Sequence, residues 1–171
     1  MKKAWCVALL LIAAVIPSSA QMKIGYINSE AIMQQLPEAQ DAQKQLDAIS
    51  SDWQAELTKM QSDLQHKFED YDKKKLIMSD KRRAEEEKEL QDLDKKMVDF
   101  RTAKFGANGE LFSKQNELMK PIQDKVFKAV KDVATEGDYD YVFDKSSSTL
   151  LMYSNEKNDL TSKVLAKLQQ K

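Results

Sequence analysis

Apolar residues recur between positions 46 and 71 at intervals of three and four, the spacing of one face of an α-helix. The intervals run 3-4-4-3-4-4-3, an eleven-residue repeat that predicts a straight or slightly right-handed stripe. Mostly Asp, Glu, Lys, Gln and Ser occupy the positions between. A helix with so narrow a stripe cannot enclose a globular core and needs a partner helix along its length. The stripe consists of Leu46, Ile49, Trp53, Leu57, Met60, Leu64, Phe68 and Tyr71.

A second striped segment follows an interruption at residues 73–83. Pro37 suits the first turn of the first helix, and Ser79 can cap the second. Two long amphipathic helices joined by a short polar turn predict an antiparallel helical hairpin. About 40 residues per helix would give an arm roughly 60 Å long. The second stripe contains Leu90, Leu93, Met97 and Phe100, and continues through Ala107, Leu111, Leu118, Ile122, Val126, Ala129 and Val133.

Three residues interrupt the return helix. Gly106 and Gly109 each cost about 1 kcal/mol relative to Ala within a helix, and Pro121 removes a backbone hydrogen bond. We interpret all three as hinges of the arm. At the two glycines a simple break between separate helices is equally compatible with the sequence.

Both ends of the chain alternate with a period of two, which is typical of strands. Residues 22–27 predict one strand and residues 139–144 a second. After a turn at 146–148, residues 149–153 predict a third strand that is apolar on both faces. Ser29 can cap a brief helical turn after the first strand. Either Asp159 or Thr161 can cap a last helix with an apolar side at Leu160, Val164, Leu165 and Leu168.

The sequence therefore predicts an α+β, mainly helical fold. The hairpin arm comprises residues 29–121 with its tip near 73–83, and a small β-rich body comprises residues 21–28 and 122–171. Three short strands leave apolar edges unpaired, so we expect this body to mediate oligomerisation. The expected contact residues are Ile24, Tyr26, Tyr139, Tyr141, Phe143, Leu151 and Tyr153.

Residues 1–20 have the pattern of a secretory signal peptide. Lys2 and Lys3 precede an apolar run at residues 4–16 that is too short for a membrane span. Small residues at 18–20 then form a cleavage site, so we expect cleavage before Gln21 and export of the protein.

The remaining chain contains no cysteine, because Cys6 is the only one in the sequence. Disulfides and thiolate metal sites are thereby excluded from the exported protein. Its formal charge is −3, from 25 basic and 28 acidic side chains, so net charge gives no reason to expect nucleic-acid binding.

Basic charge is concentrated at the predicted tip, where residues 73–83 carry a net +5. Such a tip would attract anionic head groups or acidic protein segments, at roughly 1 kcal/mol per basic residue near an anionic membrane. The alternative interpretation is that any exposed helical turn needs soluble residues. The basic residues are Lys73, Lys74, Lys75, Lys81, Arg82 and Arg83.

No set of residues in the sequence points to catalysis. His66 is the only histidine and lies on a charged helix, and there is no Ser/His/Asp set or metal-ligand cluster. Gly and Pro are scarce, which leaves few loops to carry an active site. A phosphate-binding glycine loop is also missing. We therefore expect a protein that is not an enzyme and uses no cofactor or ATP.

Four segments carry a resemblance to a known family, namely residues 23–29, 118–126, 137–144 and 159–165. Taken in order, they resemble the Skp/OmpH family of periplasmic chaperones for outer-membrane proteins. They cover the chain from the first strand to the last helix with the hairpin between them. The resemblance implies a homotrimer whose arms enclose a cavity for unfolded outer-membrane proteins, and a link to lipopolysaccharide. This sequence departs from the strongly basic members, because its pI is near 6.0.

The leading hypothesis is thus an ATP-independent holdase that binds unfolded outer-membrane proteins between its arms in the periplasm. Flexible methionine side chains would help such promiscuous binding. The sequence does not separate stripe residues that face the hairpin seam from those that face a client. Anionic lipid or lipopolysaccharide is a further candidate partner at the arm tips. The alternative function is a structural coiled-coil spacer or tether in the cell envelope.

Overall fold

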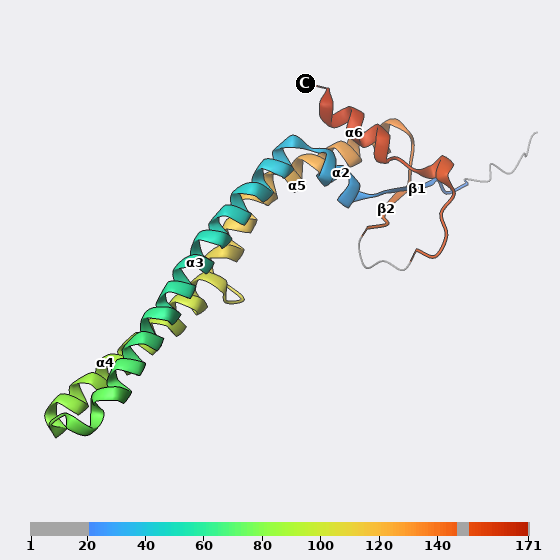
Figure 1. The fold of residues 1–171 in the computed structure, drawn as a ribbon. Helices are drawn as coiled ribbons and strands as arrows, with labels where there is room; N and C mark the ends of the chain where they lie inside the picture. The colour runs from blue at the N-terminus through green and yellow to red at the C-terminus, as the bar shows by residue number, and fades with distance from the viewer. Residues whose placement is uncertain (1–20, 147–150, 171) are drawn as a thin grey trace, which may run out of the picture.

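The computed structural model describes residues 21–146 and 151–170. A long arm of paired helices projects from a small base, and the segments near the two ends of the chain lie together in that base (Figure 1). The mainly helical hairpin fold predicted from the sequence is confirmed. The elements are β1 (Ile24–Ile27), α2 (Ser29–Gln35), α3 (Pro37–Lys74), η1 (Lys75–Ile77), α4 (Asp80–Phe105), α5 (Glu110–Glu136), β2 (Tyr141–Asp144), η2 (Glu156–Asn158) and α6 (Thr161–Gln169).

The outgoing half of the arm is the single helix α3. Pro37 is its first residue, as predicted, since proline at this position loses no hydrogen bond that the helix would make. Its 38 residues give a length of about 57 Å. The chain reverses through η1, and the Ser79 hydroxyl accepts a hydrogen bond from the Arg82 amide at 3.3 Å. The predicted cap of the return helix is therefore confirmed.

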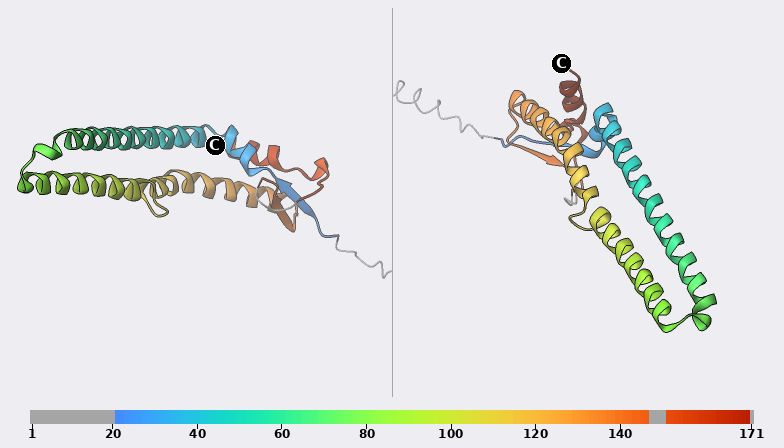
Figure 2. Two further views of the ribbon diagram at one scale, coloured as in Figure 1. Left: turned by 60° about the horizontal axis from the view of Figure 1, so that its bottom comes forward. Right: turned by 90° about the vertical axis from the view of Figure 1, so that its left-hand side faces the viewer.

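The return half of the arm consists of two helices, α4 and α5. A loop at residues 106–109 separates them, so the glycines mark a break. Figure 2 shows this loop protruding from the arm while α3 runs unbroken beside both return helices. Pro121 lies inside α5, which continues through it.

The sheet in the base contains two parallel strands from opposite ends of the chain. Ile24 pairs with Tyr141, and Tyr26 pairs with Phe143. Part of the third predicted strand, residues 149 and 150, lies outside the described residues. Its remainder, residues 151–153, forms no strand, and that prediction is wrong. The continuous apolar run was misleading here, because Leu151, Met152 and Tyr153 are exposed and pair with no strand among the described residues.

Two predicted caps also differ in detail. Asn28, rather than Ser29, caps α2, because its side-chain oxygen accepts a hydrogen bond from the Ala31 amide at 3.0 Å. The residue before α6 is Leu160, which makes no side-chain cap. Asp159 nevertheless accepts a hydrogen bond from the Thr161 amide at 2.9 Å, so one of the two proposed residues does serve the start of α6.

The hydrophobic core lies in the base, where β1, α2 and the start of α3 meet α5 and α6. Ile32, Leu160 and Val164 are the largest fully buried side chains. One face of α5 closes this core with Ile122, Val126, Ala129 and Val133. By contrast, α4 has no buried residue. The base is therefore the packed part of the molecule, and the outer arm is a two-helix ribbon.

The expected signal peptide, residues 1–20, lies outside the described residues. No helix within the described ranges is long and apolar enough to cross a membrane.

Candidate functional site

The seam between α3 and the return helices contains the predicted stripe but buries little of it. Only Leu46 and Leu57 of the stripe are buried, and Phe68 is 53% exposed. The other apolar side chains are covered by the opposite helix and remain open at the sides of the arm, because two helices share only one contact surface. The same residues therefore hold the hairpin together and present apolar surface. Half-buried members are Ile49, Trp53, Met60, Leu64, Leu90, Leu93, Met97 and Phe100.

Towards the tip, the seam opens into a shallow groove lined by Leu64, Phe68 and Leu90. Beside it, the Tyr71 hydroxyl donates a hydrogen bond to Glu87, and this bond raises the pKa of Tyr71. Such cross-helix contacts fix the relative register of α3 and α4. They leave the apolar floor of the groove accessible.

A second cross-helix contact lies close by. Lys67 on α3 forms an ion pair with Glu89 on α4, and the hydrogen bond from Lys67 lowers the pKa of Glu89. Both side chains are about half exposed, so the pair contributes little to stability and acts mainly on alignment.

The six basic residues of the predicted tip do gather at the end of the arm, but acidic neighbours offset most of their charge. Lys75 lies 2.6 Å from Asp72, and Arg82 lies 2.5 Å from Glu86. Lys73 and Arg83 have more distant partners in Asp70 and Asp80. Residues 70–86 hold six basic and five acidic side chains, a net +1. The tip is thus less basic than residues 73–83 alone suggest.

Two aliphatic side chains at the tip are almost fully exposed. Leu76 and Ile77 lie in η1, where the chain reverses, and expose 89% and 86% of their surfaces. The sequence pattern did not single out Leu76, because no helical or strand periodicity applies across a turn. The arm therefore ends in an apolar point with charged side chains around it.

The predicted hinge residues occupy three different environments. Gly109 is buried, Gly106 is half-buried, and Pro121 is exposed on α5. An added Cβ at Gly106 would lie 2.4 Å from the Thr102 carbonyl oxygen. Glycine is needed here because a side chain would collide with the backbone of α4. The backbone angle itself does not require glycine, because any residue can adopt the φ of −63° at Gly106.

The predicted oligomerisation residues divide between surface and interior. Ile24, Tyr141 and Phe143 share one exposed face of the sheet, and the two aromatic rings stack at 6.4 Å. Tyr26 is buried instead, and Tyr139 packs against the core. Leu151 and Tyr153 are exposed on the segment before η2. Tyr26 pairs with Phe143 and lies on this same face, where Lys145 contacts its ring. One chain thus covers Tyr26 but leaves Ile24, Tyr141 and Phe143 42–54% exposed.

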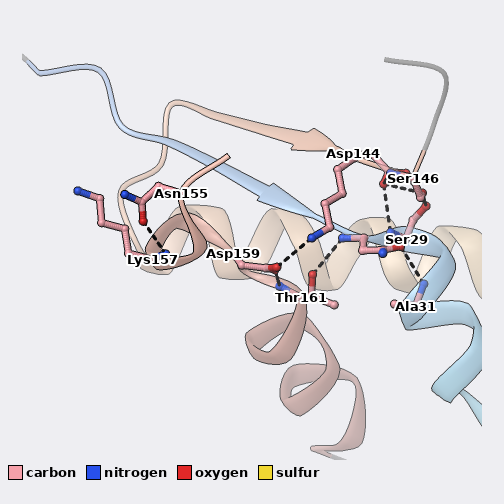
Figure 3. A network of polar contacts seen from close by, with 10 residues as sticks. Ser29, Ala31, Asp144, Ser146, Asn155, Lys157, Asp159 and Thr161 are labelled. Atoms are coloured by element: carbon pink, nitrogen blue, oxygen red, sulfur yellow. Dashed lines mark hydrogen bonds and ion pairs between the residues drawn. The ribbon is translucent and has the colours of Figure 1, made fainter. Parts of the chain in front are cut away.

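A polar network joins β2 to α2 beside this sheet (Figure 3). The Ser29 hydroxyl and amide both donate to the Asp144 carboxylate, and Ser146 donates to it from its hydroxyl at 2.7 Å. Burial raises the pKa of Asp144, but these hydrogen bonds outweigh burial and lower it. Sequence periodicity missed this network, because Ser29 and Asp144 are 115 residues apart in the chain.

Asp159 anchors the other side of the base. Burial raises the pKa of its carboxylate, but hydrogen bonds from Thr161 and the charge of Lys145 lower it further than burial raises it. Lys145 lies 3.4 Å from Asp159 and 4.8 Å from the Tyr26 ring. These contacts hold η2 and α6 against β1.

The described residues contain no group of three or more His, Cys, Asp or Glu side chains placed to hold a metal ion. His66 lies exposed on α3. What the geometry offers is apolar surface on the arm, at its tip and on the sheet.

Comparison with known proteins gives consistent findings. The model of the family described as "Outer membrane protein (OmpH-like)" matches residues 23–168. "Chaperone protein Skp" of Yersinia enterocolitica is 32% identical over 166 residues, covering 96% of this chain and 98% of the relative. The protein of the same name from Vibrio cholerae is 32% identical over 150 residues, covering 86% and 84%.

A solved structure from Caulobacter crescentus, described as an OmpH-like outer membrane chaperone, superposes with a TM-score of 0.69. It covers 87% of this chain and 85% of its own, at 16% identity, so this likeness concerns the fold. The family match and the near-full-length relatives confirm the resemblance found in the sequence: the chain belongs to the OmpH-like family.

Proposed function

We propose that this protein is a periplasmic, ATP-independent holdase that binds unfolded outer-membrane proteins and prevents their aggregation. The observation that carries the proposal is the half-open seam of the arm. Apart from buried Leu57, its apolar side chains from Ile49 to Tyr71 lie along about 33 Å of α3 and stay half-buried or exposed. The relatives' shared name, chaperone, supports the same function.

Binding on such a surface needs no chemistry. An unfolded strand of a membrane barrel exposes alternating apolar residues, and many weak contacts along the seam would hold it. Met60 and Met97 add adaptable side chains to the seam, which suits clients of varied sequence. The surrounding charged residues keep the loaded arm soluble.

The holding cavity requires more than one arm. We propose that three copies assemble through the exposed sheet face of Ile24, Tyr141 and Phe143, so that their arms enclose the client. Apolar faces of this kind are unusual on a chain that functions alone. The unpaired edges of a two-stranded sheet favour the same conclusion.

The test is dilution of a urea-unfolded outer-membrane barrel protein, without nucleotide, into buffer with and without the purified protein. Light scattering reports aggregation, which the protein should suppress at near-stoichiometric trimer. Phe68→Ser should weaken suppression several-fold, because it removes an exposed apolar contact, whereas Ser62→Ala on the same helix should not. A spacer or tether would leave aggregation unchanged.

The tip supports a second candidate activity, contact with an anionic lipid surface. Leu76 and Ile77 are exposed, as are the apolar side chains that anchor proteins at a membrane interface. Lys74 and Lys81 make no ion pair among the described residues, so their charges are available to anionic lipid. Co-sedimentation with phosphatidylglycerol vesicles tests this activity. Leu76→Ser with Ile77→Ser should abolish binding, and loss only on raising the salt would indicate a purely electrostatic contact.

A further inference from the structure

The break between α4 and α5 is closed by its own backbone. The Gly106 amide donates to the Thr102 carbonyl at 2.9 Å, and the Gly109 amide donates to the Gly106 carbonyl at 2.8 Å. These two bonds make a tight loop, but they do not attach the loop to α3. Apart from the apolar seam, any attachment of the two return helices to α3 at this break must come from side chains.

Lys104 makes that attachment from the last turn of α4. Its ammonium group lies 2.6 Å from the Glu110 carboxylate, which is at the start of α5 on the far side of the loop. It also lies 4.7 Å from the centre of the Trp53 ring on α3. A single positive charge thus contacts all three helices that meet at the break.

The surroundings strengthen these contacts. The Lys104 side chain is only 21% exposed, so water screens its interactions less than those of other arm lysines. The ring of Phe105 meets Trp53 edge-on at 6.1 Å, and Phe100 lies 5.8 Å from the Lys104 ammonium. Cation–π contacts gain strength when they are partly desolvated, as here.

No other ion pair of the arm has this arrangement among the described residues. Lys114 and Glu117, at 2.7 Å, lie three residues apart in α5 and join one helix to itself. Lys67 and Glu89 join α3 to α4 without spanning a break. The pair of Lys104 and Glu110 is the one that bridges α4 and α5, six residues apart.

We propose that Lys104 is a brace that holds the α4–α5 junction closed against Trp53 of α3. The glycines permit the break, and the brace sets how often it opens. If the protein is the holdase proposed above, this equilibrium also regulates how far the arm yields to a bulky client. Lys104 thus controls how readily the α4–α5 junction opens.

Hydrogen–deuterium exchange of the purified protein tests the brace without any client. Lys104→Met keeps the aliphatic stem and removes the charge, so peptides covering residues 101–112 should exchange about five- to twentyfold faster. Glu110→Gln should give a smaller increase, because the contact with Trp53 remains. Lys104→Arg should restore slow exchange, since arginine retains both interactions.

Lys114→Met is the matched control, because it removes an arm ion pair ten residues away that spans no break. Its exchange in residues 101–112 should equal that of the wild type. Unchanged exchange in Lys104→Met, or an equal increase in Lys114→Met, would overturn the brace. Peptides from the base serve as an internal standard for global unfolding.

The consequence for clients is measured separately by aggregation suppression of a large and a small barrel protein. Lys104→Met should improve suppression of the large client and leave the small one unchanged. If exchange rises but both clients behave as with the wild type, regulation by the brace is refuted. If even the wild type suppresses neither, the holdase function fails while the brace stands.

Discussion

Leu160 in the base and Leu76 at the tip carry the same side chain in opposite surroundings. Leu160 is 1% exposed and packs between β1, α5 and α6, whereas Leu76 is 89% exposed. Burial stabilises an aliphatic side chain through both transfer from water and close packing. The stability of the molecule therefore depends on the base, and the tip residues are free to serve binding.

Leu160→Ala should consequently lower the free energy of unfolding by about 2–5 kcal/mol, because a cavity remains in the core. Urea titration followed by circular dichroism at one protein concentration measures this change. Leu76→Ala is the control and should change stability by less than about 0.5 kcal/mol. Equal effects of the two substitutions would contradict the burial difference.

Asp144 makes the stability of the base depend on pH. Its hydrogen bonds lower the pKa of the folded carboxyl, so the charged form is favoured by folding. This contribution is fully present above the unfolded aspartate pKa of about 4 and is lost as the pH falls through the folded value. The lowered pKa of Asp159 acts in the same direction.

Ser29→Ala should therefore destabilise the protein at pH 7 and destabilise it less at pH 3, because part of the Asp144 contribution is lost below the unfolded aspartate pKa of about 4. Urea unfolding at the two pH values measures the difference. Ser62→Ala, exposed on the arm, is the control and should show no such pH dependence. A Ser29→Ala effect of equal size at both pH values would show that the hydroxyl acts through packing alone.

At the scale of elements, Pro121 shows how packing overrides local preference. A proline inside a helix removes one backbone hydrogen bond and strains the preceding turn, yet α5 continues through it. Ile122, Val126 and Ala129 directly after it are buried in the core and hold the helix in place. The packing of these residues thus offsets the free-energy cost of the lost hydrogen bond at Pro121, which is itself exposed.

Pro121→Ala should raise the stability by about 1–2 kcal/mol, since the helix regains a hydrogen bond and part of this gain is offset by a more flexible unfolded chain. The urea midpoint measures it, with Lys128→Ala on the same helix as the control. If Pro121 is also a hinge, the variant should suppress aggregation of bulky clients less well. A lower midpoint would mean that α5 needs the proline for its packing.

Most elements could be predicted from the sequence because their signals are local. The stripe from Leu46 to Tyr71 predicted the long helix α3. Pro37 and Ser79 predicted the starts of α3 and of the return helix. The strands at Ile24 and Tyr141 followed from alternation, although their parallel pairing did not. Signals within a few residues of one another were sufficient for these features.

The remaining features depend on contacts between distant residues. A short apolar run could not distinguish a paired strand from the exposed segment at Leu151–Tyr153, because pairing requires a neighbouring strand that the local sequence does not specify. The sequence left open whether the two glycines form a hinge or a break between helices, because the end of α4 at Gly106 depends on its close approach to Thr102. Lys104 carries no local signal at all, since its partners Trp53 and Glu110 come from other elements.

At the scale of the whole molecule, one chain combines a packed base with a narrow arm, and its exposed apolar surfaces lie far apart. The tip lies at one end of the molecule, and strands β1 and β2 lie at the other (Figure 1). Ile24, Tyr141 and Phe143 are exposed on these strands. A single arm cannot surround a client. The proposed function therefore requires that the sheet face be covered by other copies.

Phe143→Lys should prevent assembly, because it places a charge in the centre of the proposed apolar contact, where burial without a partner is costly. Sedimentation velocity should report a trimer for the wild type and a monomer for the variant. Leu76→Lys, an equally large change at the exposed tip, should remain trimeric. Circular dichroism should show both variants to be as helical as the wild type, since Phe143 lies outside the core of one chain. A trimeric Phe143→Lys variant would move the contact to another surface, and a monomeric wild type would remove the enclosed cavity from the proposed mechanism.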